Sequence, residues 1–232
     1  MDKVVRVGLL GFGTVGTGVV RVLTENASLI AQRAGTAIAI KKILVRDPNK
    51  KRALSTTAEL TTDPTSVIRD PEIDIVAELL GGEEPARTLM LEALNQGKHV
   101  VTANKDVMAK YGRELFEAAE KNNVNLLFEA SVGGGIPIIR PLKRCLAANR
   151  ISEVMGIVNG TTNYMLDKMT SEGMDFATVL AEAQAKGYAE ADPTADVGGL
   201  DAARKIAILA SIAFGTRVRL DDVSAEGITK IE

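Results

Sequence analysis

Short apolar runs alternate with longer amphipathic stretches through the first half of the chain. Val4–Leu10 is mostly apolar and rich in β-branched residues, which is typical of a parallel strand covered on both faces. The segment after it carries apolar residues near helical spacing and stops at Gly35. Further strands are indicated at 37–45, 74–80, 99–102 and 125–129, and helices at 85–97 and 112–122. The pattern predicts a parallel α/β sheet over residues 1–130.

The pattern changes after residue 130. Residues 130–137 are too irregular for a strand and too rich in glycine for a helix, so we place a domain boundary there. The elements expected beyond it are a strand at 151–158, a turn at 159–163, and helices from Tyr164, over 176–186 and over 206–214. The last helix is apolar on every side, which predicts burial all round. We therefore expect a smaller α+β domain at 131–232.

A glycine motif lies between the first predicted strand and the first predicted helix. Its residues are Gly11, Phe12, Gly13, Thr14, Val15 and Gly16. Glycines permit the tight turn, and a pyrophosphate sits on the helix N-terminus that follows. In this context the motif predicts a dinucleotide site and a Rossmann-type sheet; the alternative is a glycine-rich turn without a ligand.

The end of the second strand bears on the choice of cofactor. Arg46 and Asp47 stand there, followed by the basic run 50–52. An acid at this position binds the ribose 2′-hydroxyl of NAD, whereas an arginine accommodates the 2′-phosphate of NADP. Because Arg46 comes first, the sequence favours NADP and leaves NAD open. The basic run is also typical of a solvated surface.

The carboxyl ends of the later strands supply the next candidates. Gly81 follows the strand at 74–80, and Thr102 leads into Asn104 and Lys105. Ligands of open α/β sheets lie beyond the carboxyl ends of the strands, so we expect these residues at the active crevice. The single histidine, His99, begins its strand at the opposite end and is expected to be structural. A proton for an alcohol product must then come from another group, and lysine is the obvious candidate.

The stretch 187–205 is dense in charge. It holds the acids Glu190, Asp192, Asp196 and Asp201 and the bases Arg204 and Lys205, directly before the apolar helix. Asp201 and Lys205 are four residues apart and share a helix face, which in an isolated pair contributes about 0.3–0.5 kcal/mol. Such a cluster at the mouth of a core is typical of a small polar substrate site, although structural ion-pair networks have the same signature.

Composition narrows the class of partner. The chain has 232 residues and a net charge of −2, without a basic stripe, which argues against nucleic acid. No apolar run approaches membrane-spanning length, and the N-terminus lacks the apolar region of a signal peptide. The one cysteine, Cys145, excludes an internal disulfide and is expected to be buried in a helical run. We expect a cytoplasmic protein that binds a small ligand.

Five motifs in order carry a family resemblance. They read GLLGFGTVGTGV, VTANK, EASVGGGIPI, GIVNGTTNYML and GYAEADPTADVGGLDAARK. With them the chain resembles homoserine dehydrogenase over essentially its whole length. The resemblance implies reduction of L-aspartate 4-semialdehyde to L-homoserine by NADPH or NADH, on the route to threonine, methionine and isoleucine.

The resemblance also implies roles for individual residues. Residues 11–16 would hold the pyrophosphate, Arg46 the adenosine end, and Lys105 would lie beside cofactor and substrate, with Gly81 and Thr102 near the cofactor. Glu190, Asp196 and Asp201 would bind the substrate, and Lys205, oriented by Asp201, would donate the proton. A sodium ion would bind Glu129 and the carbonyl groups of Val132, Gly134 and Ile136. One carboxylate with several carbonyls suits a hard cation; the alternative is a simple hinge.

One departure from the family pattern is the length. Family members continue past residue 232 with a segment that returns to the first domain and often with a regulatory ACT domain, so we expect a fragment or a shortened form. The strand at 151–158 lacks local partners, which favours pairing with absent strands or across a homodimer. The rival functions are an inactive cofactor-binding module and a reductase of another amino-acid semialdehyde or a cyclic imine.

Overall fold

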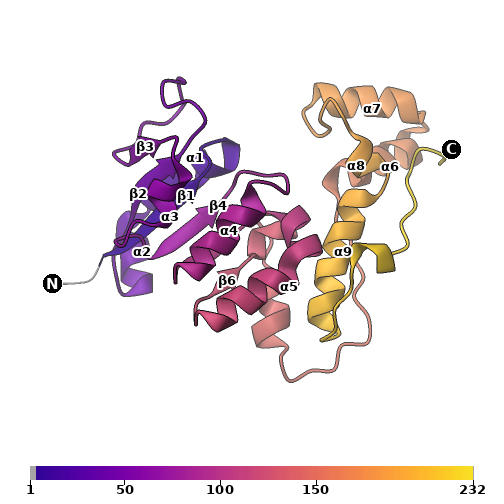
Figure 1. Cartoon of the computed structure of the whole chain (residues 1–232). Coiled ribbons are helices and arrows are strands. Elements are labelled where there is room, and N and C mark those ends of the chain that lie inside the picture. The colour runs from indigo at the N-terminus through magenta and orange to yellow at the C-terminus, as the bar shows by residue number, and fades with distance from the viewer. Residues whose placement is uncertain (1–3, 232) are drawn as a thin grey trace. The chain divides into compact units, whose positions relative to one another are not determined.

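The computed structural model describes residues 4–231. The N-terminal residues 1–3, on which the expectation about a signal peptide rests, and Glu232 lie outside the described residues. The chain divides into two compact units, Met1–Ser131 and Val132–Glu232 (Figure 1). None of the helices within residues 4–231 is long and apolar enough to cross a membrane.

A six-stranded parallel sheet forms the centre of the first unit, in the order β3-β2-β1-β4-β5-β6. The strands are β1 (Val5–Leu10), β2 (Ile38–Leu44), β3 (Glu59–Thr61), β4 (Ile75–Glu78), β5 (His99–Thr102) and β6 (Leu126–Leu127). The strand order reverses between β1 and β4, and a crevice for ligands is expected at this point of an open α/β sheet. The predicted parallel α/β fold is confirmed.

The helices of the first unit follow the strands. They are α1 (Thr14–Glu25), α2 (Ala27–Ala34), α3 (Pro64–Ile68), α4 (Ala86–Asn95) and α5 (Lys105–Lys121). Apolar strand residues form the interior, and Leu9, Ile43 and Val76 are fully buried there. This burial is what continuous apolar runs between two helical layers predict.

Helix boundaries differ from the predictions at two places in this unit, and β3 and α3 were not predicted. The stretch after the glycine motif forms two helices that meet at Asn26, and Gly35 ends the second in the left-handed conformation, with φ 72°. Helix α5 begins at Lys105, not at Gly112, because the Asn104 side chain accepts a hydrogen bond of 3.1 Å from the amide of Val107. The N-terminal cap therefore fixes where Lys105 stands.

The second unit is built from helices around its own core (Figure 1, orange to yellow). They are α6 (Gly160–Glu172), α7 (Phe176–Ala185), α8 (Thr194–Val197) and α9 (Leu200–Ala213), with the single turns η2 (Pro141–Cys145) and η3 (Leu220–Asp222). The core consists of Met165, Val179, Ala183, Ala189, Val197 and Ile228. It joins α6, α7 and α8 with the C-terminal segment that carries Ile228.

The predicted strand at 151–158 does not form within the described chain. Within the described chain these residues pair with no strand, and Met155 and Ile157 are 84% and 78% exposed. A strand requires a neighbour that takes its backbone hydrogen bonds, and residues 4–231 supply none to this segment.

Three further expectations in this unit need correction. Helix α6 begins at Gly160, not at Tyr164, because Asn159 caps it. The helix α9 buries one face through Ala203, Ala207, Ile208 and Leu209 but is not covered all round, and Phe214 at its end is exposed. Cys145 is exposed as well, since it ends the short π-helical turn η2.

Candidate active site

The three glycines of the motif at 11–16 serve different physical needs. Gly11 has φ 106°, and a Cβ there would lie 2.8 Å from the carbonyl oxygen of Leu79. A Cβ on Gly16 would lie 2.3 Å from the carbonyl oxygen of Gly11. A Cβ on Gly13 would meet no protein atom within 4 Å. The first and third glycines therefore allow close packing, and the second leaves open space where a ligand backbone can approach.

Helix α1 directs backbone amides at this open space. It begins at Thr14, and its N-cap residue Gly13 offers no side chain to the amides of the first turn. No acidic residue lies in that turn, and Val15 is 55% exposed. Unsatisfied amides at a helix N-terminus attract anions, so the geometry suits a dinucleotide pyrophosphate.

The loop after β2 closes on the glycine motif. The guanidinium of Arg52 lies 5.4 Å from the ring centre of Phe12 and donates 2.7 Å to the carbonyl of Asp47. The Asp47 carboxylate accepts 2.8 Å from the amide of Asn49, whereas Arg46 is exposed. One Asp47 oxygen is thus used within the turn, and Arg46 stands at the surface where the adenosine end of a dinucleotide is expected.

The ends of β4 and β5 bring the other predicted cofactor residues together. Thr102 is 1% exposed and donates 2.6 Å to the carboxylate of Glu78, which is fully buried. The Asn104 side chain donates 2.7 Å to the carbonyl of Gly82, next to Gly81. Lys105 follows as the first residue of α5. Glu78 was not predicted, although an acid within the predicted apolar strand 74–80 is a signal that could have identified it.

His99 lies at the other end of its strand, as predicted. It is the first residue of β5, and its Nδ1 accepts 3.0 Å from the amide of Asn125. The contact joins β5 to the segment that enters β6. The histidine therefore stabilises the sheet at the amino ends of the strands, away from the crevice.

In the second unit, buried Asp201 and half-buried Lys205 form an ion pair. The Lys205 ammonium lies 2.6 Å from the carboxylate of Asp201 and donates 2.7 Å to the carbonyl of Val158. The two side chains are 7% and 17% exposed. Both contacts fix the ammonium at the start of α9, so this pair is held far more tightly than a pair on a wet helix.

Asn159 connects this pair to a second predicted acid. Its side-chain amide donates 2.7 Å to Asp196 and 2.8 Å to Asp201, and its oxygen accepts 2.8 Å from the amide of Thr162. Asn159 is buried and caps α6. It was predicted only as part of a turn, although an Asn three residues before Thr is a capping signal.

The remaining predicted acids lie outside this hydrogen-bonded group. Glu190 is exposed, its side chain makes no hydrogen bond to residues 4–231, and its backbone carbonyl accepts 3.1 Å from Gln184. Asp192 accepts from Thr194, which lowers the pKa of its carboxyl, and it thereby supports the start of α8. The structure thus joins Asp196, Asp201 and Lys205, but not Glu190.

The residues predicted to bind sodium lie on either side of the boundary between the units. Glu129 begins the 3-10 turn η1 (Glu129–Ser131), whereas Val132, Gly134 and Ile136 follow it. Gly133 and Gly134 have φ 80° and 54°, so the backbone here follows neither helix nor strand geometry. In the described part of the chain, no three His, Cys, Asp or Glu side chains lie in an arrangement that could hold a metal ion. The proposed sodium ligands are one carboxylate and three backbone carbonyls, so they do not depend on such a side-chain cluster.

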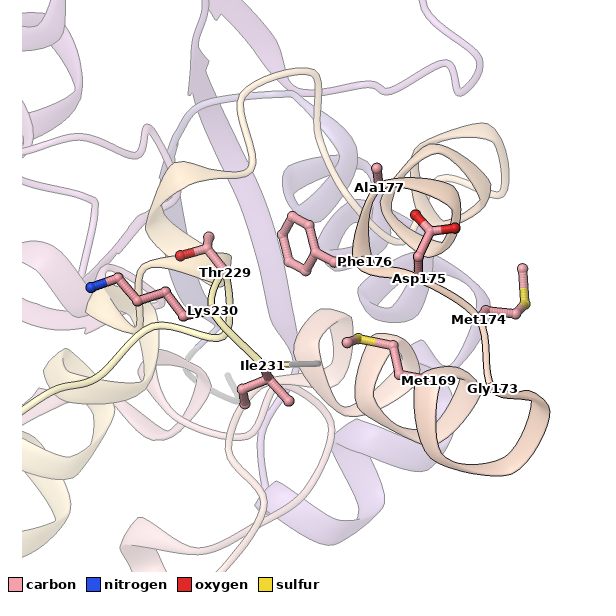
Figure 2. Close-up of a pocket in the computed structure, with 9 residues that line it drawn as sticks. All are labelled: Met169, Gly173, Met174, Asp175, Phe176, Ala177, Thr229, Lys230 and Ile231. Carbon is pink, nitrogen blue, oxygen red and sulfur yellow. The ribbon is translucent and has the colours of Figure 1, made fainter.

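A cavity of about 550 Å³ lies elsewhere in the second unit (Figure 2). Its lining comes from the end of α6, the start of α7 and the C-terminal segment: Met169, Gly173, Met174, Asp175, Phe176, Ala177, Thr229, Lys230 and Ile231. Figure 2 shows Met169, Phe176 and Ile231 around it. None of the predicted site residues lines this cavity.

Comparison with known proteins assigns both units. Residues 11–129 match the family model for the NAD-binding domain of homoserine dehydrogenase, and residues 137–232 match the model for homoserine dehydrogenase. The first match indicates a nicotinamide dinucleotide as cofactor. Together the two models cover nearly the whole chain.

Individual relatives agree. The chain is 54% identical over 231 residues to a homoserine dehydrogenase of Synechocystis, which covers 98% of this chain and 52% of that protein. It is 51% identical to the Bacillus subtilis enzyme, with 99% and 53% covered. The chain spans about half the length of the curated relatives it matches.

Solved structures give the same result. The homoserine dehydrogenase of Thiobacillus denitrificans has a TM-score of 0.95 at 52% identity, covering 99% of this chain and 53% of that one. A putative homoserine dehydrogenase of Archaeoglobus fulgidus has a TM-score of 0.84 at 34% identity, covering 98% and 73%.

Proposed function

The chain belongs to the homoserine dehydrogenase family, and on that basis we propose that it reduces L-aspartate 4-semialdehyde to L-homoserine with a nicotinamide dinucleotide. The reaction serves the biosynthesis of threonine, methionine and isoleucine. The observation that carries the proposal is the ammonium of Lys205. Two of its three N–H groups are used by Asp201 and Val158, which leaves one to face a substrate oxygen.

The chain's own groups divide the work of this reaction. When bound, the reduced nicotinamide supplies the hydride that adds to the aldehyde carbon. The carbonyl oxygen gains alkoxide character as the carbon is reduced. Lys205 transfers a proton to this oxygen, and the product is the alcohol. Asp201 fixes the direction of the ammonium, and Lys105 polarises the same oxygen.

Acidic residues recognise the amino-acid part of the substrate. Asp196 and Asp201 are held by Asn159 in the buried group beside Lys205, and Glu190 is exposed near the start of α8. A substrate ammonium pairs with such carboxylates. Replacing Glu190 by Gln removes one charge without changing size, so KM for the semialdehyde should rise while kcat stays near its original value.

The preferred cofactor is NADPH. Arg46 is exposed at the end of β2, while the Asp47 carboxylate already accepts a hydrogen bond from Asn49. An arginine at this position pairs with a 2′-phosphate, which NADH lacks. The exposed position of Arg46 therefore supports NADPH over NADH.

A sodium ion is proposed at Glu129 and the carbonyl groups of Val132, Gly134 and Ile136. One carboxylate and three carbonyls form an all-oxygen donor set, which fits a hard cation. The positive φ of Gly134 takes its carbonyl out of regular structure. Thermal unfolding in NaCl compared with tetramethylammonium chloride tests the ion without any measurement of activity; equal midpoints would contradict it.

The assembly is proposed to be a homodimer in the cytoplasm. Residues 151–158 pair with no strand in the described chain, and Met155 and Ile157 are exposed, which supports a partner for this segment. A single exposed cysteine fits a reducing compartment. Sedimentation of the full-length form as a monodisperse monomer would contradict the dimer.

Turnover tests the main proposal directly. The protein is mixed with L-aspartate 4-semialdehyde and NADPH, and the absorbance of the reduced nicotinamide is followed. We expect consumption that depends on both reactants and yields homoserine. Cofactor binding without consumption would identify an inactive cofactor-binding module instead. Faster consumption with a different amino-acid semialdehyde or a cyclic imine would reassign the substrate.

A further inference from the structure

Glu78 is an acidic side chain buried in the middle of the sheet. It is the last residue of β4 and is 0% exposed. In register it lies between Leu10, the last residue of β1, and Thr102, the last residue of β5. The first neighbour leads into the glycine motif and the second into Lys105, so Glu78 occupies the point where the strand order reverses.

Both side-chain oxygens of Glu78 accept hydrogen bonds. One accepts 2.8 Å from the amide of Leu80, and the other accepts 2.6 Å from the hydroxyl of Thr102. The Thr102 oxygen in turn accepts 2.9 Å from the amide of Asn104. The Thr102 oxygen accepts from the Asn104 amide, and its single hydroxyl proton is donated to Glu78. Hydrogen-bond donation therefore runs in one order, from Asn104 to Thr102 to Glu78.

The same bonds fix the loop between β4 and α4. Its start is held through the Leu80 amide by Glu78, and its Gly82 carbonyl accepts 2.7 Å from the Asn104 side chain. Gly81 and Gly82 have φ 75° and 71° and carry no side chains that would define this path. The conformation of the loop therefore depends on Glu78 and Asn104.

The loop also touches the glycine motif. The amide of Leu79 donates 2.9 Å to the carbonyl of Leu10, and the Leu79 carbonyl packs so closely on Gly11 that a Cβ there would lie 2.8 Å away. One buried acid thus connects three backbone segments around the crevice: the glycine motif, the loop at 79–82 and the start of α5. Burying a carboxylate costs free energy unless hydrogen bonds compensate for the lost water, and both oxygens of Glu78 accept such bonds.

We propose that Glu78 is a positioning residue for the cofactor, which through Leu80, Thr102 and Asn104 holds the loop at 79–82 and Lys105 in the arrangement that receives the nicotinamide half of the dinucleotide. The proposal rests on the proposed function, since it assumes that this crevice binds a nicotinamide dinucleotide for turnover. Glu78 acts through its neighbours and takes no part in proton or hydride transfer.

The test replaces Glu78 by Gln in the full chain. The variant keeps the size but offers one acceptor oxygen where the carboxylate offers two, so either the Thr102 hydroxyl or the Leu80 amide loses its acceptor. We expect dissociation constants for NADPH and NADH to rise about tenfold, equally for the two cofactors, because a buried donor loses its acceptor. Glu78→Asp keeps two acceptor oxygens and should recover part of the affinity.

Two further variants separate positioning from general stability. Thr102→Val removes the bond to Glu78 from the other side, together with the acceptor of the Asn104 amide, and combined with Glu78→Gln it should weaken cofactor binding no more than the worse single change. Lys98→Met is the matched control, because Lys98 is 5% exposed and donates 2.7 Å to the carbonyl of Ile73 in the same unit. It should lower the unfolding temperature without changing cofactor affinity.

The outcomes distinguish this inference from the proposed function. Cofactor affinity is measured by fluorescence titration without substrate, and turnover of the semialdehyde is measured separately on the unaltered protein. If Glu78→Gln lowers the unfolding temperature as Lys98→Met does but binds NADPH as tightly as the unaltered chain, Glu78 is only structural. If the unaltered chain binds cofactor but never turns over, the proposed function fails while the effect of Glu78 on affinity remains measurable.

Discussion

The ammonium of Lys205 lies 2.6 Å from a carboxylate oxygen of Asp201, one turn earlier on helix α9. The carbonyl of Val158, 47 residues away in the sequence, accepts a second bond of 2.7 Å from the same ammonium. The lysine is therefore held by two elements, which limits the rotamers of a long side chain. A proton donor fixed in this way can act on a bound carbonyl oxygen.

Replacing Lys205 by Met tests this role. We expect kcat for the semialdehyde to fall about 10² to 10⁴-fold, the usual range for one positioned proton donor, while the dissociation constant of NADPH stays the same. Steady-state kinetics and a cofactor titration without substrate check the two parts. A rate near that of the unaltered chain would make Lys205 a structural residue.

Lys168 supplies a control in the same unit. It pairs with Glu172 on α6, also four residues apart, but at a more exposed position. Lys168→Met removes a pair that solvent screens, so it should leave the free energy of unfolding nearly unchanged and kcat unaltered. Equal losses of kcat in the two variants would point to a general effect of removing lysine.

Two glycines of the motif should respond differently to alanine. Gly13 has φ −85°, which alanine tolerates, and its Cβ would meet no protein atom within 4 Å. Gly13→Ala should therefore keep the unfolding temperature but lower the affinity for NADPH about tenfold or more, since the new methyl group takes space needed by the pyrophosphate.

Gly16→Ala should instead harm the fold. Its Cβ would lie 2.3 Å from the Gly11 carbonyl oxygen, so backbone must move, at a cost of about 1–3 kcal/mol in the free energy of unfolding. Thermal unfolding and NADPH titration of both variants check the contrast. Unchanged NADPH affinity in Gly13→Ala would show that the pyrophosphate does not bind at this loop.

Arg46 should discriminate between the two cofactors. Arg46→Ala removes a guanidinium that can form charge-assisted bonds only with the 2′-phosphate, so KM for NADPH should rise about tenfold or more while KM for NADH changes little. Lys51→Ala in the same exposed loop is the matched control for loss of one positive charge. Equal losses for NADPH and NADH would contradict the assignment.

Asp70 should govern the acid stability of the first unit. Burial acts to raise the pKa of its carboxyl, but hydrogen bonds from Lys41, from the Glu72 amide and from Lys42 outweigh it and hold the pKa well below its usual range. The Lys41 ammonium lies 2.7 Å from the carboxylate. A lowered pKa in the folded state contributes stability above the unfolded value, near 3.9, and this contribution is lost as the pH falls through the folded value.

Asp70→Asn removes that contribution. We expect the free energy of unfolding at pH 7 to fall by about 1–3 kcal/mol, and the difference from the unaltered chain to shrink as the pH drops below about 4. Urea unfolding between pH 7 and pH 2.5 measures it. Glu72→Gln, at a 55% exposed side chain, is the control and should have a smaller effect. A difference that stays constant with pH would contradict this origin.

The sequence by itself determined the elements whose signals are local. Apolar runs predicted five of the six parallel strands of the first unit, all except β3, and the glycine motif stands between β1 and α1 as predicted. Both follow from contacts within a few residues: a run of β-branched residues favours extended backbone, and glycine permits a turn with positive φ. Even the missed helix starts at Lys105 and Gly160 have local causes, in the capping Asn104 and Asn159.

Only the tertiary structure decided which polar groups meet. Asn159 reaches Asp196 and Asp201 across 37 and 42 residues of sequence, and Thr102 reaches Glu78 across 24. The segment at 151–158 failed as a strand because the described chain gives it no neighbour. A buried polar group must find its partner in whatever element packs beside it, and a strand must find another strand. The residues adjacent in sequence to a buried polar group or a strand do not specify its partner. Tertiary packing alone decides which groups and strands pair.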